Sequence, residues 1–347
     1  MTINNLFEEA RRRIAVPDNV LKETRKRRDT IRDIVEEKFD TLRTFGSGSL
    51  AQGTQNDPLN DADAGVVLDR RVYEGLGPEG DGPCAIVEEI RSVLRPRLKE
   101  KYPDVRFYNG GHRAIRINFM EPIQAGADNF TADLIVAIRR DEGGLWIPDL
   151  DSDGWDPSDP ERHVELIVAR NKKTDSRFAR ILRLAKHANA HHGGTIVSFN
   201  VAALGLEAIT EKTSLPDGLA LFLRHAAESL DKGLTEDPAG VSDPIKVNVS
   251  RRKDAARKFK DLAELAEQAL KFDADGQTAQ AQRNWSKVLP GAIDSPKDED
   301  LEAEIAAGAR KGNQWLFRGA GGMSVSNSVR SDIPSARSFG DKNPRTR

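Results

Sequence analysis

The feature that most constrains this chain is a glycine-serine turn followed by two aspartates one residue apart. Residues 48–54 read GSLAQGT and residues 60–63 read NDAD. The apolar residues 42–45 before the turn and 64–68 after the aspartates are typical of short strands. The pattern therefore predicts a sheet in which a turn joins two strands and both aspartates stand at the start of the second strand.

These residues predict phosphate and metal chemistry. Alternate side chains of a strand share one face, so Asp61 and Asp63 should lie roughly 6–7 Å apart on the same face. Two such carboxylates repel each other unless a cation lies between them. Mg²⁺ prefers such oxygen ligands, together with substrate phosphates, and Mn²⁺ is the alternative ion. Because Gly48 has no Cβ, backbone amides and the Ser49 hydroxyl can approach the β- and γ-phosphates of a triphosphate.

A third carboxylate is expected from Asp133. Residues 131–136 read TADLIV, which places an acidic residue at the start of an otherwise apolar strand. A charge there is costly unless it is used or paired. If this strand pairs beside the strand that begins near Asp63, the three carboxylates converge on a two-metal site. Asp133 is then the candidate general base or bridging ligand at an acceptor hydroxyl.

The alternative to a metal site is that acidic residues in a turn rich in Asn and Asp are merely solvated. A single Asp-x-Asp motif would support no more than that, because short motifs recur by chance. The ordered series of strand, glycine-serine turn, paired aspartates, strand and later strand aspartate is far more restrictive. We therefore take the functional interpretation.

The remaining pattern predicts an α+β protein with two lobes. A charge-rich helix is expected at 19–39 and an amphipathic helix at 83–100, and strands at 105–108, 113–119 and 131–138. Helical periodicity then dominates at 160–171, 175–192, 198–210, 216–231, 252–272, 276–287 and 299–310. We expect a catalytic lobe over 1–150, a helical nucleotide-binding lobe over 151–317 and a flexible tail over 318–347.

Composition excludes several classes of protein. The 53 basic and 55 acidic side chains give a net charge of −2, so we expect no stable binding to nucleic acid and no tRNA substrate. No apolar run approaches the roughly 20 residues that span a bilayer, and the N-terminus does not resemble a signal peptide. The single cysteine, Cys84, rules out a disulfide scaffold. A cytoplasmic protein without a membrane anchor is expected.

The motif series resembles the polymerase-β-like nucleotidyltransferase superfamily. Within it, residues 48–54 before Asp61 and Asp63 resemble the bacterial CD-NTases, the relatives of cyclic GMP-AMP synthase and oligoadenylate synthase. Those enzymes make cyclic oligonucleotide messengers in anti-phage defence. The resemblance covers about residues 15–310. It implies NTP substrates, release of pyrophosphate, and regulatory protein partners encoded in the same defence operon.

The resemblance also implies residues that contact the nucleotide. Gly48, Ser49, Gln52 and Thr54 belong to the glycine-serine motif and are expected at the phosphates. Lys186 lies on a helix similar to the one whose lysine reaches the triphosphate in the family, although without this resemblance such a residue more often belongs to a solvated face.

Further likenesses and departures lie in both lobes. The helix at 19–39 resembles the spine helix of the family, and Ser198 stands where the family often has a Lys-Ser pair at the phosphate. Val197 replaces that lysine, and Ala62 replaces the usual larger apolar residue between the aspartates. Neither change removes a metal ligand, so an active enzyme is expected.

Three functions remain open at this point. The first is synthesis of a cyclic oligonucleotide. The second is transfer of nucleotides to RNA or to a protein side chain, and the third is nucleotide sensing by a catalytically inactive binding protein. The intact carboxylates disfavour the third.

Overall fold

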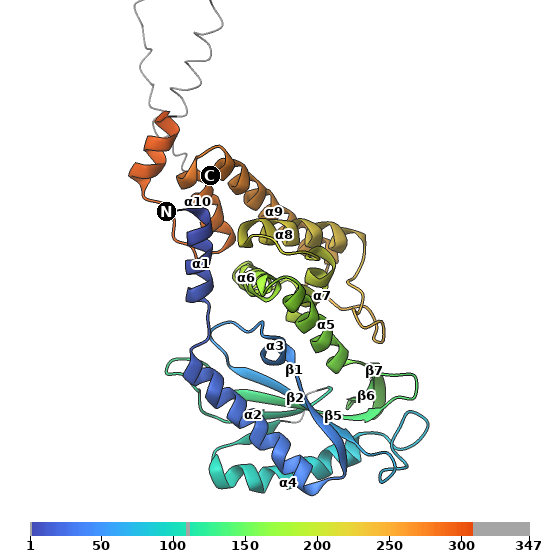
Figure 1. Ribbon diagram of the computed structural model, residues 1–347. Coiled ribbons are helices and arrows are strands. Elements are labelled where there is room, and N and C mark those ends of the chain that lie inside the picture. Colours follow the sequence, from blue (N-terminus) through green and yellow to red (C-terminus); the bar gives the residue numbers. More distant parts are fainter. Residues whose placement is uncertain (1, 109–111, 308–347) are drawn as a thin grey trace, which may run out of the picture. The chain divides into compact units, whose positions relative to one another are not determined.

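The computed structural model describes residues 2–108 and 112–307 (Figure 1). Residues 1–301 form one compact unit. Residues 298–307 are helical, as expected at the start of 299–310. The rest of that helix and the tail expected at 318–347 lie outside the described residues.

The first half of the chain contains a mixed sheet in which the strands follow the order β1-β2-β5-β4-β3, and β6 and β7 extend it from β5. Strands β2 and β5 are parallel, whereas the other pairs are antiparallel. The α+β class predicted from the sequence is therefore confirmed. The strands are β1 Thr41–Ser47, β2 Asp61–Leu68, β3 Arg106–Tyr108, β4 Ile115–Asn118, β5 Thr131–Arg139, β6 Leu145–Asp149 and β7 Gly154–Ser158.

Helices α2 (Asp18–Lys38) and α4 (Cys84–Lys101) cover one face of this sheet (Figure 1). Their apolar residues join those of the central strands in one hydrophobic core. Val67 and Ala137 point to the other face, where they belong to a smaller cluster. Because β2 and β5 are covered on both faces, their sequences read as continuous apolar runs rather than as alternating ones.

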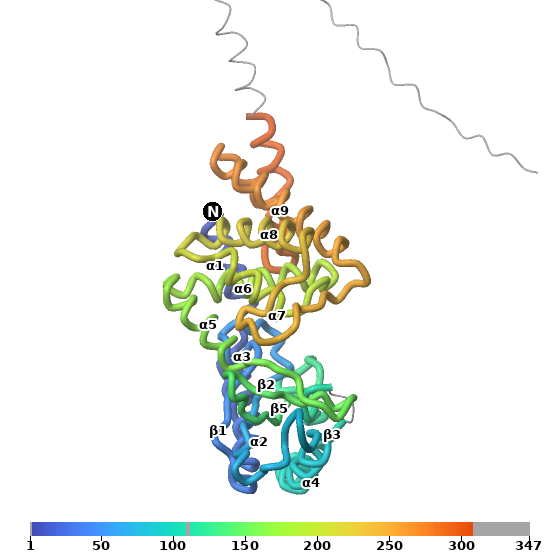
Figure 2. Tube along the Cα trace, turned by 90° about the vertical axis from the view of Figure 1, so that its right-hand side faces the viewer, coloured from blue at the N-terminus to red at the C-terminus, as the bar shows by residue number. Residues whose placement is uncertain are grey.

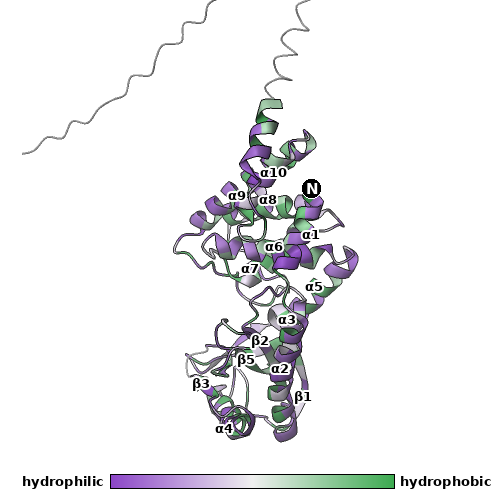
Figure 3. Ribbon diagram, turned by 90° about the vertical axis from the view of Figure 1, so that its left-hand side faces the viewer, coloured by the Kyte–Doolittle hydropathy of each residue, from purple (hydrophilic) through white to green (hydrophobic). Residues whose placement is uncertain are grey.

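The later helices form a second hydrophobic core. They are α5 Pro160–Lys173, α6 Arg177–His191, α7 Ser198–Ala208, α8 Leu215–Lys232, α9 Arg252–Ala274 and α10 Thr278–Val288. Helix α5 begins as predicted, because Asp159 caps it by accepting a hydrogen bond from the amide of Arg162 at 2.9 Å. Hydrophilic and hydrophobic stripes run along the helices (Figure 3), as expected where one side covers a core.

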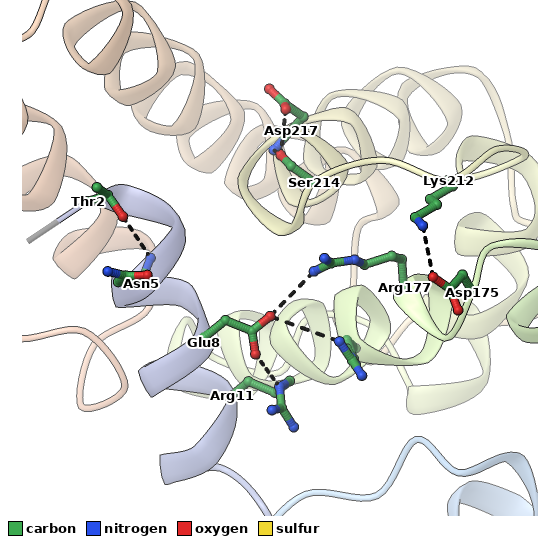
Figure 4. Close-up of polar contacts among 10 residues, drawn as sticks. Thr2, Asn5, Glu8, Arg11, Asp175, Arg177, Lys212, Ser214 and Asp217 are labelled. Atoms are coloured by element: carbon green, nitrogen blue, oxygen red, sulfur yellow. Dashed lines mark hydrogen bonds and ion pairs between the residues drawn. The ribbon is translucent and has the colours of Figure 1, made fainter.

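The structure adds a first helix that the sequence analysis did not predict. Helix α1 (Ile3–Arg13) packs in the core of the later helices, although residues 1–150 were grouped as one lobe. Phe7 is fully buried, and its ring meets that of Trp285 edge-on at 4.7 Å. Glu8 pairs with Arg11 on the same helix and with Arg177 on α6 (Figure 4).

The sheet also extends further than expected. Residues 154–158 were not predicted to form a strand, but they form β7, which pairs with β6. Trp155 is buried in the core of the sheet. The hydrogen bonds between β6 and β7 therefore carry the sheet past residue 150, to the residue before the cap of α5.

The docking of α1 can be tested by Phe7→Ala. We expect a loss of about 3–5 kcal/mol in the free energy of unfolding, because a fully buried aromatic ring is removed. Urea unfolding of the purified chain measures it. Val168→Ala is the control, since this α5 side chain is 50% exposed, and should change the value by less than about 0.5 kcal/mol. Equal effects of both variants would contradict the packing described for α1.

Candidate active site

Three aspartates meet at the start of two neighbouring strands. Strand β2 pairs with β5 in a register that places Asp61 opposite Thr131 and Asp63 opposite Asp133. The pairing proposed for the strand of Asp133 is therefore present. Strand β1 ends on the other side of β2, where Ser47 is the partner of Asp63.

The glycine-serine turn packs directly on this strand start. Residues Gly48–Gln52 form the short helix α3, which follows β1 without a linker. Gly48 has a positive φ of 64°, and a Cβ built on it would lie 1.7 Å from Oδ2 of Asp63. Only glycine allows this approach, since any other side chain would collide with the carboxylate.

A cavity of about 740 Å³ opens at this point. Figures 1 and 2 show α3 and the start of β2 where the sheet meets α5, α6 and α7. The lining residues are Ser47, Gly48, Ser49, Gln52, Asp61, Asp63, Arg113, Asp156, Pro157, Ser158, His163, Lys186, Val197, Ser198, Phe199, Ser242, Asp243, Pro244, Ile245 and Lys246. The volume lies in the range typical of small-molecule sites.

The carboxylates in the cavity lack enough positive charge to balance them. Burial, and then the negative charges of Asp61 and Asp133, raise the pKa of Asp63 to about 7. Burial and Asp133 also raise the pKa of Asp61. Lys186 faces both aspartates, but burial lowers its own pKa to about 8 despite their attraction. The site thus favours a bound cation.

The third carboxylate is held differently from what was expected. Asp133 accepts two hydrogen bonds of 3.2 Å from the Arg116 guanidinium, which comes from the neighbouring strand β4. It is not among the residues that line the cavity. Within residues 2–108 and 112–307, no group of three or more His, Cys, Asp or Glu side chains is arranged to hold a metal ion. The two strands thus pair in the expected register, but among the described residues the three carboxylates do not form a complete set of metal ligands.

The donor set nevertheless suits Mg²⁺. Asp61 and Asp63 supply hard carboxylate oxygens beside a cavity, and burial and neighbouring carboxylates raise the pKa of each despite the attraction of Lys186. Mg²⁺ is usually held by one or two protein carboxylates together with substrate phosphates. The pair is therefore sufficient to bind the ion with a nucleotide, with Asp133 on the adjacent strand.

Most residues expected at the nucleotide line the cavity: Gly48, Ser49, Gln52, Lys186 and Ser198. Thr54 does not, because its side chain is fully buried. Its hydroxyl accepts a hydrogen bond of 2.8 Å from Nζ of Lys186. Thr54 therefore orients the lysine from behind the cavity wall rather than contacting a ligand.

Other residues that line the cavity were missed by the sequence analysis. They include Arg113, Asp156, His163, Phe199 and the loop residues 242–246. The cap at Asp159 signalled the start of α5 and could have drawn attention to His163, one turn into the helix. The loop carries no periodicity and no motif, so nothing in its sequence indicated a place in the site.

Comparison with known proteins agrees with this geometry. Residues 1–171 match the family model of the Second Messenger Oligonucleotide or Dinucleotide Synthetase domain. No curated protein matches the chain. Solved structures resemble it over most of its length. Escherichia coli MS115-1 CdnC with ATP has a TM-score of 0.61 at 15% identity, and the match covers 85% of this chain and 99% of CdnC.

Two further relatives share the fold. The Bradyrhizobium diazoefficiens CD-NTase CdnG with GTP has a TM-score of 0.60 at 16% identity, covering 87% of this chain and 96% of CdnG. Vibrio cholerae DncV, a cyclic AMP-GMP synthase, has 0.55 at 14%, covering 84% and 87%. CdnC is also known in complex with HORMA-deltaN, with a TM-score of 0.58 at 16% identity, covering 81% of this chain and 95% of that one.

These findings identify the class of protein. Residues 1–171 match the second messenger oligonucleotide or dinucleotide synthetase domain family, and the fold is that of the CD-NTases. The resemblance inferred from the glycine-serine and aspartate motifs is confirmed, and with it the enzyme class of nucleotidyltransferase.

The contact between the turn and Asp63 is tested by Gly48→Ala. We expect loss of nucleotide turnover, because the new methyl group would displace the Asp63 carboxylate. Gly53→Ala is a matched control. Gly53 also has a positive φ, of 67°, but a Cβ there would meet nothing within 4 Å. Both variants should lose about 1 kcal/mol or more in unfolding free energy from backbone strain, but only Gly53→Ala should keep its activity.

The raised pKa of Asp63 predicts a pH-dependent effect of Asp63→Asn in metal-free protein. Between its ordinary pKa of 3.8 and about 7, the folded state binds the proton more tightly than the unfolded state. Stability from this group is therefore lost as pH rises through this window. At pH 7.5 the variant should melt above wild type, because a buried charge is gone. At pH 5.5 the difference should be smaller, and it should vanish only near pH 3.8, where the unfolded chain is protonated as well.

Thermal unfolding with a metal chelator present at both pH values measures this. A melting difference that is the same at pH 5.5 and pH 7.5 would contradict the assignment.

Proposed function

We propose that this chain is a Mg²⁺-dependent nucleotidyltransferase that joins NTPs into a cyclic di- or oligonucleotide second messenger. The observation that carries the proposal is the pair Asp61 and Asp63, whose pKa values are raised by burial and neighbouring carboxylates and which shares one cavity with Ser49 and Lys186. The domain family supports a second-messenger product. The relatives support NTP substrates, since CdnC binds ATP and CdnG binds GTP.

The proposed role of each residue follows from its place in the cavity. Ser49 and the backbone amides at the start of α3 bind the β- and γ-phosphates, and Lys186 and Ser198 approach them from α6 and α7. Asp61 and Asp63 hold Mg²⁺, which supplies charge neutralisation at the α-phosphate when it is bound.

The transfer itself replaces one bond to phosphorus by another. The ribose hydroxyl oxygen of a second nucleotide forms a bond to the α-phosphorus, and the bond from the α-phosphorus to pyrophosphate breaks. Asp133, held in place by Arg116, takes the hydroxyl proton. A second transfer in the same cavity closes the ring.

The biological setting is proposed on the same basis. CdnC forms a complex with HORMA-deltaN, which supports a regulatory protein partner for this chain. A role in anti-phage defence signalling is proposed from the family resemblance of the sequence alone. No helix among the described residues is long and apolar enough to cross a membrane. A cytoplasmic location and the absence of stable nucleic-acid binding remain proposals from the sequence.

One assay tests the function. The full chain is incubated with labelled ATP, GTP, CTP and UTP plus Mg²⁺ or Mn²⁺, and the products are treated with phosphatase. We expect a small resistant product, because a ring has no terminal phosphate for the enzyme to remove. Asp61→Asn combined with Asp63→Asn should abolish it while the fold is kept. Asp141→Asn, at a side chain that is 93% exposed, is the control and should retain activity.

Other outcomes would overturn the proposal. Label that appears only on added RNA or protein indicates transfer to a macromolecule. NTP binding without turnover, with every acceptor supplied, indicates a nucleotide-sensing protein. Product formation by the double variant would refute the assignment of the metal ligands.

A further inference from the structure

One wall of the cavity is a loop whose ends are tied together. The amide of Ile245 donates to the carbonyl of Thr235 at 2.7 Å, which closes residues 235–245 into a loop. Thr235 is 1% exposed, and its hydroxyl accepts a hydrogen bond of 3.2 Å from the buried Asn200 on α7. The loop then presents residues 242–246 to the cavity.

Asp237 shapes this loop from within. It is only 6% exposed. Its carboxylate accepts hydrogen bonds from the amides of Ala239 at 3.2 Å, Val241 at 2.9 Å and Ser242 at 2.8 Å. Burial by itself would raise the pKa of Asp237, but these amides and the nearby His163 lower it. The carboxylate is therefore held as an anion, and the backbone of residues 239–242 folds around it.

His163 connects the loop to the helices. Its Nε2 lies 2.6 Å from Oδ1 of Asp237, and its residue is 8% exposed. It comes from the first turns of α5, and its ring packs against that of Phe199 on α7 at 4.6 Å. Both rings line the cavity. A single His–Asp contact thus joins α5 and the start of α7 to the loop.

The middle of the loop, residues 239–241, is not buried in a hydrophobic core. Ala239, Gly240 and Val241 line a second cavity of about 370 Å³. Gly240 has a positive φ of 67°, and a Cβ there would meet nothing within 4 Å. The hydroxyl of Ser242 adds one further bond, of 3.1 Å, to the carbonyl of Pro157. Ile245 is buried at the end of the loop, but the position of the middle of the loop depends on polar contacts, of which those to Asp237 are the most buried.

We propose that His163 and Asp237 are positioning residues that hold the loop 237–246 as the wall against which the nucleotide binds. This inference rests on the proposed function, because it takes the cavity to be the NTP site. The His163–Asp237 contact acts on binding rather than on bond formation, since the proposed metal ligands and Ser49 stand on other elements. Loss of the contact should therefore raise KM and leave kcat nearly unchanged.

His163→Phe is the main test, because it keeps a ring against Phe199 but removes the Nε2 donor. With ATP and GTP as probes and Mg²⁺ present, we expect KM to rise about tenfold, as for loss of a hydrogen bond to a charged group. The change in kcat should stay within about twofold. His163→Gln should recover most of the loss, since its amide nitrogen can replace Nε2. Should Phe prevent folding, His163→Asn removes the contact with a smaller polar side chain.

His225→Phe is the matched control. His225 makes a similar contact, with Nε2 at 2.7 Å from Oε2 of Glu207, but neither residue lines the cavity. KM and kcat should therefore remain those of wild type in this variant. A rise in KM that is equal in the two histidine variants would refute the proposal.

Hydrogen exchange separates this inference from the function on which it rests. The amides of Val241 and Ser242 should exchange slowly in wild type and faster in His163→Phe, whether or not the chain makes a product. Unchanged exchange in the variant would overturn the role of His163. Faster exchange with an unchanged KM would overturn the role of the loop in binding. A wild-type chain that forms no product from any NTP would instead overturn the proposed function.

Discussion

The parallel pairing of β2 with β5 is the constraint on which the site depends. It brings Asp133 beside Asp63 although 70 residues of sequence separate them. Both strands are covered on two faces, so a slip of one residue would move every apolar side chain to the opposite face and turn the aspartates away from the cavity. The hydrophobic effect that fixes the register thereby also fixes the position of the charges.

That register concentrates negative charge where little water can screen it. The pKa of Asp63 rises to about 7, and Gly48 must approach its carboxylate without a side chain. The positive groups nearby, Lys186 and Arg116, come from α6 and β4 rather than from the motif itself. Lys186 is in turn held by Thr54. The site is built from both hydrophobic cores, and its unbalanced charge makes it receptive to a cation.

The motif residues could be predicted because their chemistry is local. Strand alternation placed Asp61 and Asp63 on one face, and the apolar run after Asp133 marked a covered strand. The helices after residue 160 were predicted closely because most of them carry an apolar stripe, and α5 and α8 begin at a capping side chain. Helix α1 was missed because its charged residues 8–13 obscured the stripe that begins at Ile3. The strand β7 was missed because Trp155, Asp156 and Pro157 look like a turn until β6 pairs with them.

The sequence by itself determined the class of chemistry, the candidate metal ligands and the α+β order of elements. Each of these depends on residues close together in the chain or on a simple period. Only the tertiary structure decided that Thr54 supports Lys186 instead of touching a ligand, and that Arg116 holds Asp133. It alone showed that the contact between His163 and Asp237 holds a loop at the cavity, although the sequence of that loop carries no motif. Such contacts join residues distant in sequence, and they form only when helices and sheet have packed, so no local pattern records them.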